Sequence, residues 1–203
     1  MSISPPETRA SLILRLQNAA DVSAWDQFAA IYAPVVYRSA RRLGLQAADA
    51  DDCVQEVLTA VSGAIATWLK REDRGSFRRW LFRIARNTAI DFLSRRRHRP
   101  WAAGGDAAAV ELQHQEASAT ASSHFDLEYR REVFRRAAAV VRGQVTEMTW
   151  QAFYRSSVLQ QNISDVASDL GLSCGSIYLA RSRVMKRLQQ VAESLRGSDG
   201  DEM

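Results

Sequence analysis

The sequence has little of several features that would narrow its class. Cysteine occurs twice, at Cys53 and Cys174, with no CxxC pair or nearby histidine pair, which excludes a disulfide framework and a zinc knuckle. We expect both thiols to be buried and reduced. With 10 Gly and 4 Pro in 203 residues, collagen-like and low-complexity chains are excluded. No run approaches the roughly 18 consecutive apolar residues of a membrane helix, and no signal-peptide blocks begin the chain. We expect a cytoplasmic globular protein without a metal or other cofactor.

Catalytic patterns are also missing. The three histidines are His98, His114 and His124, and all lie in or beside one weakly apolar segment. The sequence contains no phosphate-binding glycine loop and no cluster with metal-ligand spacing. Asp51 and Asp52 are adjacent, but neighbouring side chains on a helix point in different directions. An enzyme that acts on nucleic acid is therefore disfavoured, and we predict a non-enzymatic protein.

Charge is strongly segregated along the chain, although the net charge is only +4. Residues 43–69 carry four acids and no base, residues 70–99 eleven bases and three acids, and residues 100–129 five acids and no base. A solvated helix face usually mixes both signs, so the basic block favours a polyanionic partner over ordinary solvation. Nucleic acid is the leading candidate.

Apolar residues recur with the helical period through most of the chain, and no segment alternates as a strand would. We predict an all-α protein of two small domains joined by a flexible linker. The first covers residues 1–97, with helices at 12–33 and 35–43 either separated or kinked at Pro34, which has no backbone N–H to donate. The remaining predicted parts are an acidic linker at 98–127, a second domain at 128–196 and an acidic tail at 197–203.

The second domain is predicted to end in a helix-turn-helix. Its first helix has apolar residues at the spacing of a buried face: Phe134, Ala137, Ala138 and Val141. Near the C-terminus, Asn162 can cap a helix, Gly171 can end it in the left-handed conformation, and Ser173 can cap the next. A turn this short between two capped helices is typical of a DNA-binding motif whose second helix enters the major groove.

The predicted contacts to duplex DNA lie at the start and on the outer face of this second helix. They are Ser173, Ser176, Tyr178, Ser182, Arg183 and Lys186. Leu179 also points outward, which suits either contact with a thymine methyl or cover for a neighbouring side chain. A plain αα-hairpin with solvated arginines is the alternative interpretation.

A basic helix predicted from Phe77 to about Arg97 combines arginines with aromatic residues. This pairing suits single-stranded nucleic acid, because bases stack on rings while arginines follow phosphates. Aromatics at helical spacing are more often core residues, and we assign Phe77 and Phe92 to the core. For Trp80 both interpretations stay open, since it shares one helix edge with the hydrogen-bonding amide of Asn87.

These motifs together resemble the extracytoplasmic-function (ECF) group of bacterial RNA polymerase sigma factors. The segment DADDCVQEVLTAV is similar to the family's helix that docks on the clamp coiled coil of the largest polymerase subunit. The segment FRRWLFRIARNTAIDFLSRRR is similar to its promoter-melting helix, and the helix-turn-helix to its reader of the minus-thirty-five element. The resemblance covers roughly residues 12–97 and 128–195 and leaves the linker unmatched.

The resemblance implies a specificity subunit that binds core RNA polymerase and promoter DNA and initiates transcription. The implied polymerase contacts are Asp49, Asp52, Gln55 and Glu56, and the implied minus-ten contacts are Arg79, Trp80, Arg83, Arg86 and Asn87. The loop at 67–76 resembles the family's pocket for a flipped base, and an anti-sigma protein is a further candidate partner. Promoter sequence does not carry over, because Tyr178 and Ala180 stand where the family usually has basic residues.

The main alternative is a free-standing helix-turn-helix regulator that binds operator DNA without polymerase. Its first domain would then serve dimerisation or sensing, and its sites would be palindromes with half-sites about one helical turn apart. That scheme gives no role to the melting helix or to the acidic face of the docking helix, which carries Asp49, Asp52 and Glu56.

Overall fold

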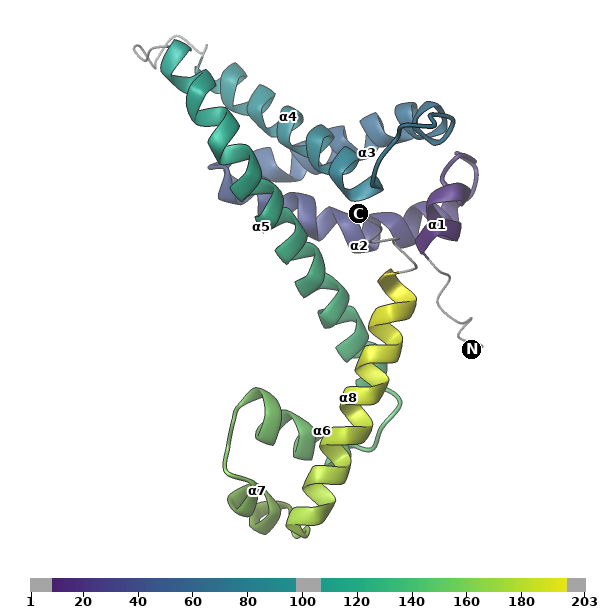
Figure 1. The fold of residues 1–203 in the computed structure, drawn as a ribbon, viewed down its shortest axis with the longest axis vertical. Coiled ribbons are helices and arrows are strands. Elements are labelled where there is room, and N and C mark those ends of the chain that lie inside the picture. The colour runs from purple at the N-terminus through teal and green to yellow at the C-terminus, as the bar shows by residue number, and fades with distance from the viewer. Residues whose placement is uncertain (1–8, 98–106, 197–203) are drawn as a thin grey trace. The chain divides into compact units, whose positions relative to one another are not determined.

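The computed structural model describes residues 9–97 and 107–196, and these residues form helices and connecting turns without a strand (Figure 1). The all-α prediction is confirmed. Expectations for residues 1–8, 98–106 and 197–203, the acidic tail among them, lie outside the described residues. The chain divides into two compact units, an N-terminal unit of Ala10–Glu132 and a C-terminal unit that begins at Val133.

The N-terminal unit contains α1 (Arg9–Arg15), α2 (Val22–Arg42), α3 (Ala47–Leu69) and α4 (Phe77–Arg97). Figure 1 shows α3 lying against both α2 and α4. The start of α2 is fixed by Asp21, whose carboxylate accepts a hydrogen bond from the Ala24 N–H at 3.0 Å and two from the Arg15 guanidinium at 2.8 Å. These bonds lower the pKa of Asp21, those from Arg15 most.

Of the two alternatives at Pro34, a separation into two helices is wrong, because α2 continues through that residue. A proline inside a helix removes one backbone hydrogen bond and crowds the preceding turn. Here the flanking turns are held by apolar packing, since Tyr32, Val35 and Val36 are buried on either side. Burial of such side chains is worth roughly 1.5–3 kcal/mol each, enough to offset the cost of the proline.

Aromatic rings form the centre of the N-terminal unit. Phe77, at the start of α4, contacts Phe28 and Tyr32 of α2 with ring centroids 5.9 and 5.8 Å apart, and it lies 5.5 Å from Trp68 of α3. The core assignment of Phe77 is confirmed. Phe92 is only half-buried, with the Arg95 guanidinium 5.3 Å above its ring. One aromatic cluster thus joins three helices.

The structure differs from the predicted flexible linker. Helix α5 runs from Ala107 to Arg142, so the alanine-rich residues 107–127 are helical, in keeping with the high helix propensity of alanine. Phe125 and Tyr129 are buried in the N-terminal unit. Phe125 lies 5.5 Å from Phe82 of α4, and Tyr129 stacks on Tyr32 at 5.7 Å. The boundary between units therefore falls after Glu132, not after residue 127.

Ion pairs fasten the same face of α5 to α2. The Arg38 guanidinium donates to Glu128 at 2.6 Å and to Glu132 at 3.0 Å. The Glu132 side chain is only 6% exposed, and Arg38 supplies a partner of opposite charge for it. Arg131 donates to Glu128 as well. Ion pairs and apolar contacts therefore both hold residues 125–132 of α5 against the rest of the N-terminal unit.

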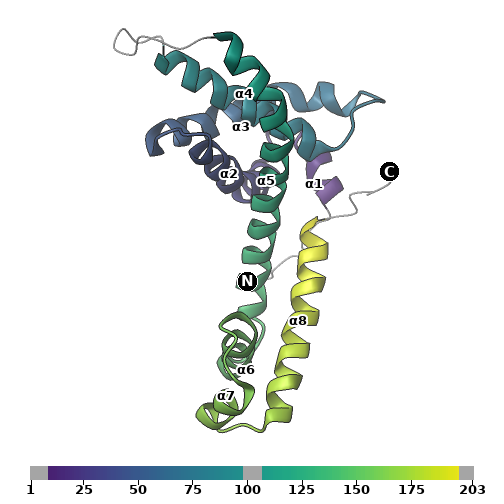
Figure 2. The same ribbon diagram turned by 60° about the vertical axis from the view of Figure 1, so that its left-hand side comes forward.

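The C-terminal unit holds the end of α5, then α6 (Glu147–Phe153), a π-helical turn (Tyr154–Val158), α7 (Ile163–Leu170) and α8 (Cys174–Arg196) (Figure 2). Its core combines Ala137 and Val141 of α5 with Trp150 and Phe153 of α6 and with Val184 and Leu188 of α8. The predicted burial of Phe134 is wrong, because its side chain is 51% exposed. Ala137 and Val141 supply the buried face instead.

Within residues 9–97 and 107–196, no helix combines the length and apolarity that a membrane span requires.

The two cysteines differ from each other in burial. Cys53 is buried as predicted, and burial, with the nearby Glu56 charge, raises its pKa to about 11. The prediction for Cys174 is wrong, because this residue is exposed in the first turn of α8.

Candidate functional site

The first candidate surface is the acidic face of α3. Asp52, Gln55 and Glu56 are exposed at spacings of three and four residues, which places them on one side of the helix. Asp49, one turn earlier, is half-buried. The opposite face of α3 is packed into the unit through Cys53, Val54, Val57, Val61 and Ile65. The amphipathic pattern thus leaves three of the four predicted polymerase contacts, Asp52, Gln55 and Glu56, turned outward.

Glu56 is already engaged by a neighbouring helix. Arg95 of α4 donates to its carboxylate at 3.1 Å, and the two side chains are 63% and 44% exposed. An exposed pair of this kind contributes about 0–1 kcal/mol, so a basic partner can replace it at small cost. Sequence reasoning could not find this contact, because the two residues lie 39 positions apart.

The second candidate surface lies along α4. Arg79, Arg83 and Asn87 are exposed at intervals of four residues, and Arg86 is half-buried beside them. The opposite side of α4 buries Leu81, Ala85 and Ala89 in the unit. A row of guanidiniums one helical turn apart suits the phosphates of a nucleic-acid backbone. The structure therefore gathers four of the five predicted minus-ten residues on one accessible face.

Trp80, the fifth predicted minus-ten residue, packs against the aromatic core and is also partly exposed. Its half-buried ring stacks on Trp68 of α3, with centroids 5.2 Å apart and an interplanar angle of 25°, and it lies 5.5 Å from Phe77. One side of the indole is thus held by the aromatic core, while part of the ring stays accessible. A ring held in this way is positioned for stacking without the entropy cost of ordering it.

The loop between α3 and α4 is built around the other indole, that of Trp68. Its Nε1 donates to the Arg74 carbonyl at 3.2 Å, and the Arg74 guanidinium lies 5.5 Å from the centre of its ring. Arg74 also donates to the Leu69 carbonyl at 2.7 Å. Sequence reasoning named this loop only as a whole and missed both residues. The helical spacing of Trp68 after Ile65 was the available signal.

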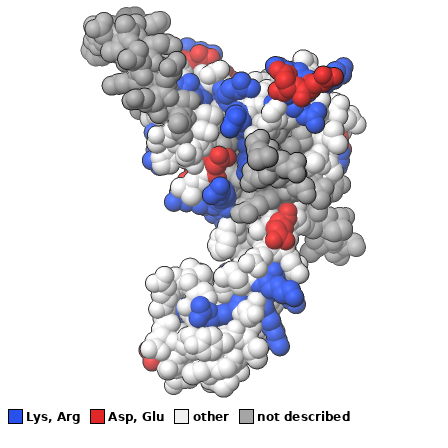
Figure 3. Space-filling model, in the orientation of Figure 1, with Lys and Arg blue, Asp and Glu red and all other residues white. Residues whose placement is uncertain are grey.

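Both signs of charge are present at the tip of this loop, visible as adjacent red and blue side chains in the upper right of Figure 3. Arg71 and Asp73 form a bidentate pair at 3.1 and 3.0 Å. The hydrogen bond and charge of Arg71 lower the pKa of Asp73. Gly75 follows with a φ of +64°, a conformation that other residues adopt at a cost. Hydrogen bonds made by Trp68, Arg74 and the Arg71–Asp73 pair therefore hold the loop in this conformation.

The third candidate surface is the predicted helix-turn-helix, α7 and α8. Asn162 caps α7 by accepting from the Ser164 N–H at 2.9 Å, and Gly171 ends it with a φ of 63°. The Leu172 N–H donates to the Ala167 carbonyl at 2.9 Å, which completes the turn. The predicted caps and the turn glycine are all observed. Ile177 and Ala180 of α8 pack against Val166 and Ala167 of α7.

The outer face of α8 carries most of the predicted duplex contacts. Tyr178, Ser182, Arg183 and Lys186 are exposed, and so is Leu179 at 59%. Ser173 and Ser176 are used differently. The Ser173 Oγ accepts from the Ser176 N–H at 3.1 Å, and the two hydroxyls lie 2.9 Å apart. Ser173 therefore caps α8 as predicted, and the contacts of both serines with DNA stay predictions.

Comparison with known proteins finds a family match for the part of the chain that carries the α3 and α4 surfaces. Residues 28–99 match the sigma-70 region 2 family model. This match confirms the resemblance drawn from the motifs of α3 and α4. No curated protein matches. Among solved structures, CnrH in complex with the cytosolic domain of CnrY aligns over 91% of this chain and 96% of its own, at 21% identity and a TM-score of 0.36.

Proposed function

Residues 28–99 are a sigma-70 region 2 domain, and from this premise we propose that the whole chain acts as an RNA polymerase sigma factor of the ECF group. In this role it binds core polymerase, directs it to specific promoters and assists the opening of the duplex. The observation that carries the proposal is the pairing, within that domain, of an exposed acidic face on α3 with an exposed basic face on α4.

Each face suits one partner. Asp52, Gln55 and Glu56 present carboxylates and an amide to a basic protein surface, and the Arg95 pair gives way to that surface at little cost. Arg79, Arg83 and Arg86 hold phosphates, while Trp80 and Asn87 engage bases exposed by melting. The acidic and basic side chains stand on separate helices, so both partners can bind together.

The C-terminal unit supplies the second DNA contact in this proposal. Tyr178, Ser182, Arg183 and Lys186 on α8 read the major groove of the minus-thirty-five element, with α7 supporting the recognition helix. The basic residues of α8 between Arg181 and Arg187 add affinity through phosphates. Promoter recognition therefore uses both units of one chain.

The test is run-off transcription with purified core RNA polymerase on genomic promoter fragments, preceded by a pull-down of the same polymerase. The wild-type chain is expected to bind polymerase and yield new transcripts. The double variant Gln55→Ala/Glu56→Ala is expected to lose both while keeping its helical circular dichroism. The matched control is Gln189→Ala/Glu193→Ala, which removes an exposed Gln and Glu from α8.

Full transcription by the α3 double variant would contradict the docking assignment. Tight DNA binding by the wild-type chain without any polymerase association would instead support a stand-alone helix-turn-helix regulator. Loss of transcription in both double variants would show that the effect is not specific to α3.

A further inference from the structure

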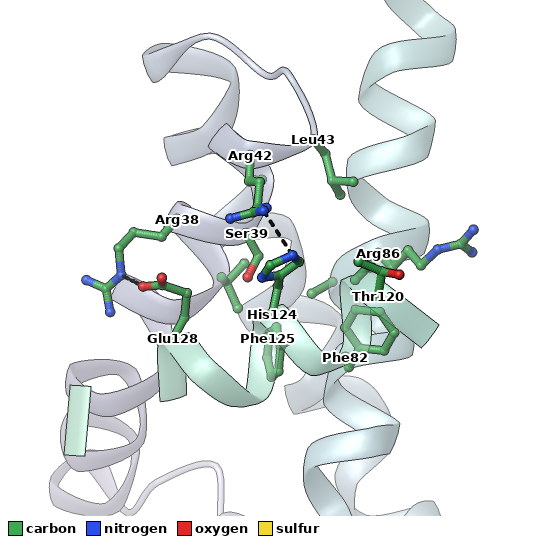
Figure 4. Close-up of a pocket in the computed structure, with 14 residues that line it drawn as sticks. Arg38, Ser39, Arg42, Leu43, Phe82, Arg86, Thr120, His124, Phe125 and Glu128 are labelled. Atoms are coloured by element: carbon green, nitrogen blue, oxygen red, sulfur yellow. Dashed lines mark hydrogen bonds and ion pairs between the residues drawn. The ribbon is translucent and has the colours of Figure 1, made fainter. Parts of the chain in front are cut away.

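A pocket of about 720 Å³ opens between α2, α4 and α5 within the N-terminal unit (Figure 4). Its volume falls within the range of roughly 300–1,000 Å³ found for small-molecule sites. Apolar groups come from all three helices, in particular Val36 of α2, Phe82 of α4 and Phe125 of α5. The Phe82 and Phe125 rings lie 5.5 Å apart and form one wall. None of these three side chains belongs to the proposed polymerase or DNA contacts.

Arginines give the pocket a positive character. Arg38 is neutralised by Glu128 and Glu132, whereas Arg42 is not. The Arg42 guanidinium donates to the His124 Nε2 at 2.9 Å, and no carboxylate of the described residues pairs with it. Because a guanidinium only donates, Nε2 accepts and the imidazole proton lies on Nδ1. The Arg42 guanidinium therefore faces an imidazole, not a carboxylate, beside an apolar wall.

The Arg42 guanidinium points in a different direction from that of Arg86, one of the proposed phosphate contacts (Figure 4). Arg42 and His124 point toward each other over the pocket, while the Arg86 guanidinium points away from His124. Arg86 lines the pocket, but in this view its guanidinium is turned away from the Arg42–His124 pair. Occupation of the pocket thus leaves the proposed phosphate contacts in place.

We infer that this pocket binds a small organic anion with an apolar body, whose carboxylate or phosphate group pairs with Arg42. A guanidinium with no carboxylate partner prefers such a group, because two parallel N–H donors match its oxygens. The aromatic wall accepts the apolar body, and the Thr120 hydroxyl at the pocket lining adds a hydrogen-bond donor. This inference goes beyond the proposed function and does not depend on it.

The bound anion would contact α5 as well as α2 and α4, since Thr120, His124 and Phe125 line the pocket. A ligand that binds only when these helices are together stabilises that arrangement by mass action. Binding is therefore expected to slow amide hydrogen exchange in residues 120–128, a region that sequence composition alone would assign to a linker.

The experiment uses the full chain and two fluorescent probes of similar shape. 1-Anilinonaphthalene-8-sulfonate is an aromatic anion, and N-phenyl-1-naphthylamine is its uncharged counterpart. The wild-type chain is expected to bind both saturably. Arg42→Gln should weaken binding of the anionic probe about tenfold and leave the neutral probe unchanged, since a charge-assisted hydrogen bond is lost. Arg41→Gln, on the same helix turn but outside the pocket lining, is the matched control.

Ala121→Trp fills the pocket from α5 and should abolish binding of both probes. A cooperative urea transition in each variant ensures that the probes report on folded protein. Displacement of the anionic probe by decanoate assigns a carboxylate ligand, and displacement by AMP assigns a phosphate ligand. Equal binding of the anionic probe by wild type, Arg42→Gln and Ala121→Trp would overturn the inference, as would failure of both decanoate and AMP to displace it.

Discussion

Glu128 provides a quantitative test of how α5 is held to the N-terminal unit. Its side chain is 15% exposed and accepts hydrogen bonds from Arg38 and Arg131, each at 2.6 Å. Burial by itself would raise the pKa of Glu128, but the hydrogen bonds and charges of the two arginines outweigh it. The pKa therefore lies below the ordinary value of 4.5. The change Glu128→Gln keeps the shape of the side chain and removes its charge.

The expected loss follows from the contacts. A hydrogen bond to a charged group contributes roughly 1.5–3 kcal/mol when it is sheltered from water. Arg38 keeps Glu132 as a partner at 3.0 Å, and Arg131 is 58% exposed, so its pair adds less than about 1 kcal/mol. We expect Glu128→Gln to lower the free energy of unfolding by about 1–2 kcal/mol at neutral pH.

The pH dependence has a definite sign. A carboxyl group whose pKa is lowered in the folded state stabilises that state above its unfolded pKa, near 4.5 here. This contribution is lost as the pH falls through the folded pKa. The difference between wild type and Glu128→Gln should therefore be full at about pH 7 and shrink below about pH 4.5.

Equilibrium urea unfolding followed by circular dichroism measures both quantities. Glu193→Gln, at an exposed position on α8, is the control and should change stability by less than about 0.5 kcal/mol at either pH. A loss of the same size at acidic and neutral pH would refute the reasoning, because it would not come from the charge. No loss at neutral pH would refute it as well.

Three other expectations concern DNA contacts and the thiols. Arg83→Ala should weaken promoter binding and reduce the slope of log affinity against log salt by about one, whereas Arg130→Ala, exposed on α5, should leave the slope unchanged. Arg183→Ala should change the upstream sequence recovered by in vitro selection, and an identical selected motif would speak against groove contact. Ellman's reagent should label one thiol of the native protein rapidly, because Cys174 is exposed whereas Cys53 is buried with a pKa of about 11. Cys174→Ser should remove that rapid phase, and its persistence would contradict the assignment.

Local chemistry made part of the fold predictable from the sequence. The caps at Asn162 and Ser173 and the left-handed Gly171 depend on residues within four positions, so the pattern was sufficient to identify them. Pro34 and Phe134 were misjudged for the opposite reason. Whether a proline interrupts a helix, or an apolar residue is buried, depends on packing partners elsewhere in the chain.

The same distinction applies to α5 and to the candidate site. Phe125 and Tyr129 meet Phe82 and Tyr32 across long sequence separations, so a composition that resembles a linker concealed a packed helix. The resemblance implied polymerase contacts at Asp52, Gln55 and Glu56, but it gave no sign that Arg95 would pair with one of them. The hydrogen bond between the Ser173 and Ser176 hydroxyls likewise emerged only from the geometry. The roles of these residues in binding stay predictions until they are tested.

The stacked indoles of Trp68 and Trp80 have an optical consequence. Two identical chromophores with centroids 5.2 Å apart and planes 25° from parallel share their electronic excitations. Their strong far-ultraviolet absorption bands couple, so we expect the circular dichroism of the N-terminal unit to contain a contribution that isolated tryptophans lack. A third aromatic ring placed against Trp80 would perturb that coupling. The protein therefore carries, without any attached dye, an internal spectroscopic reporter of what approaches the surface of α4.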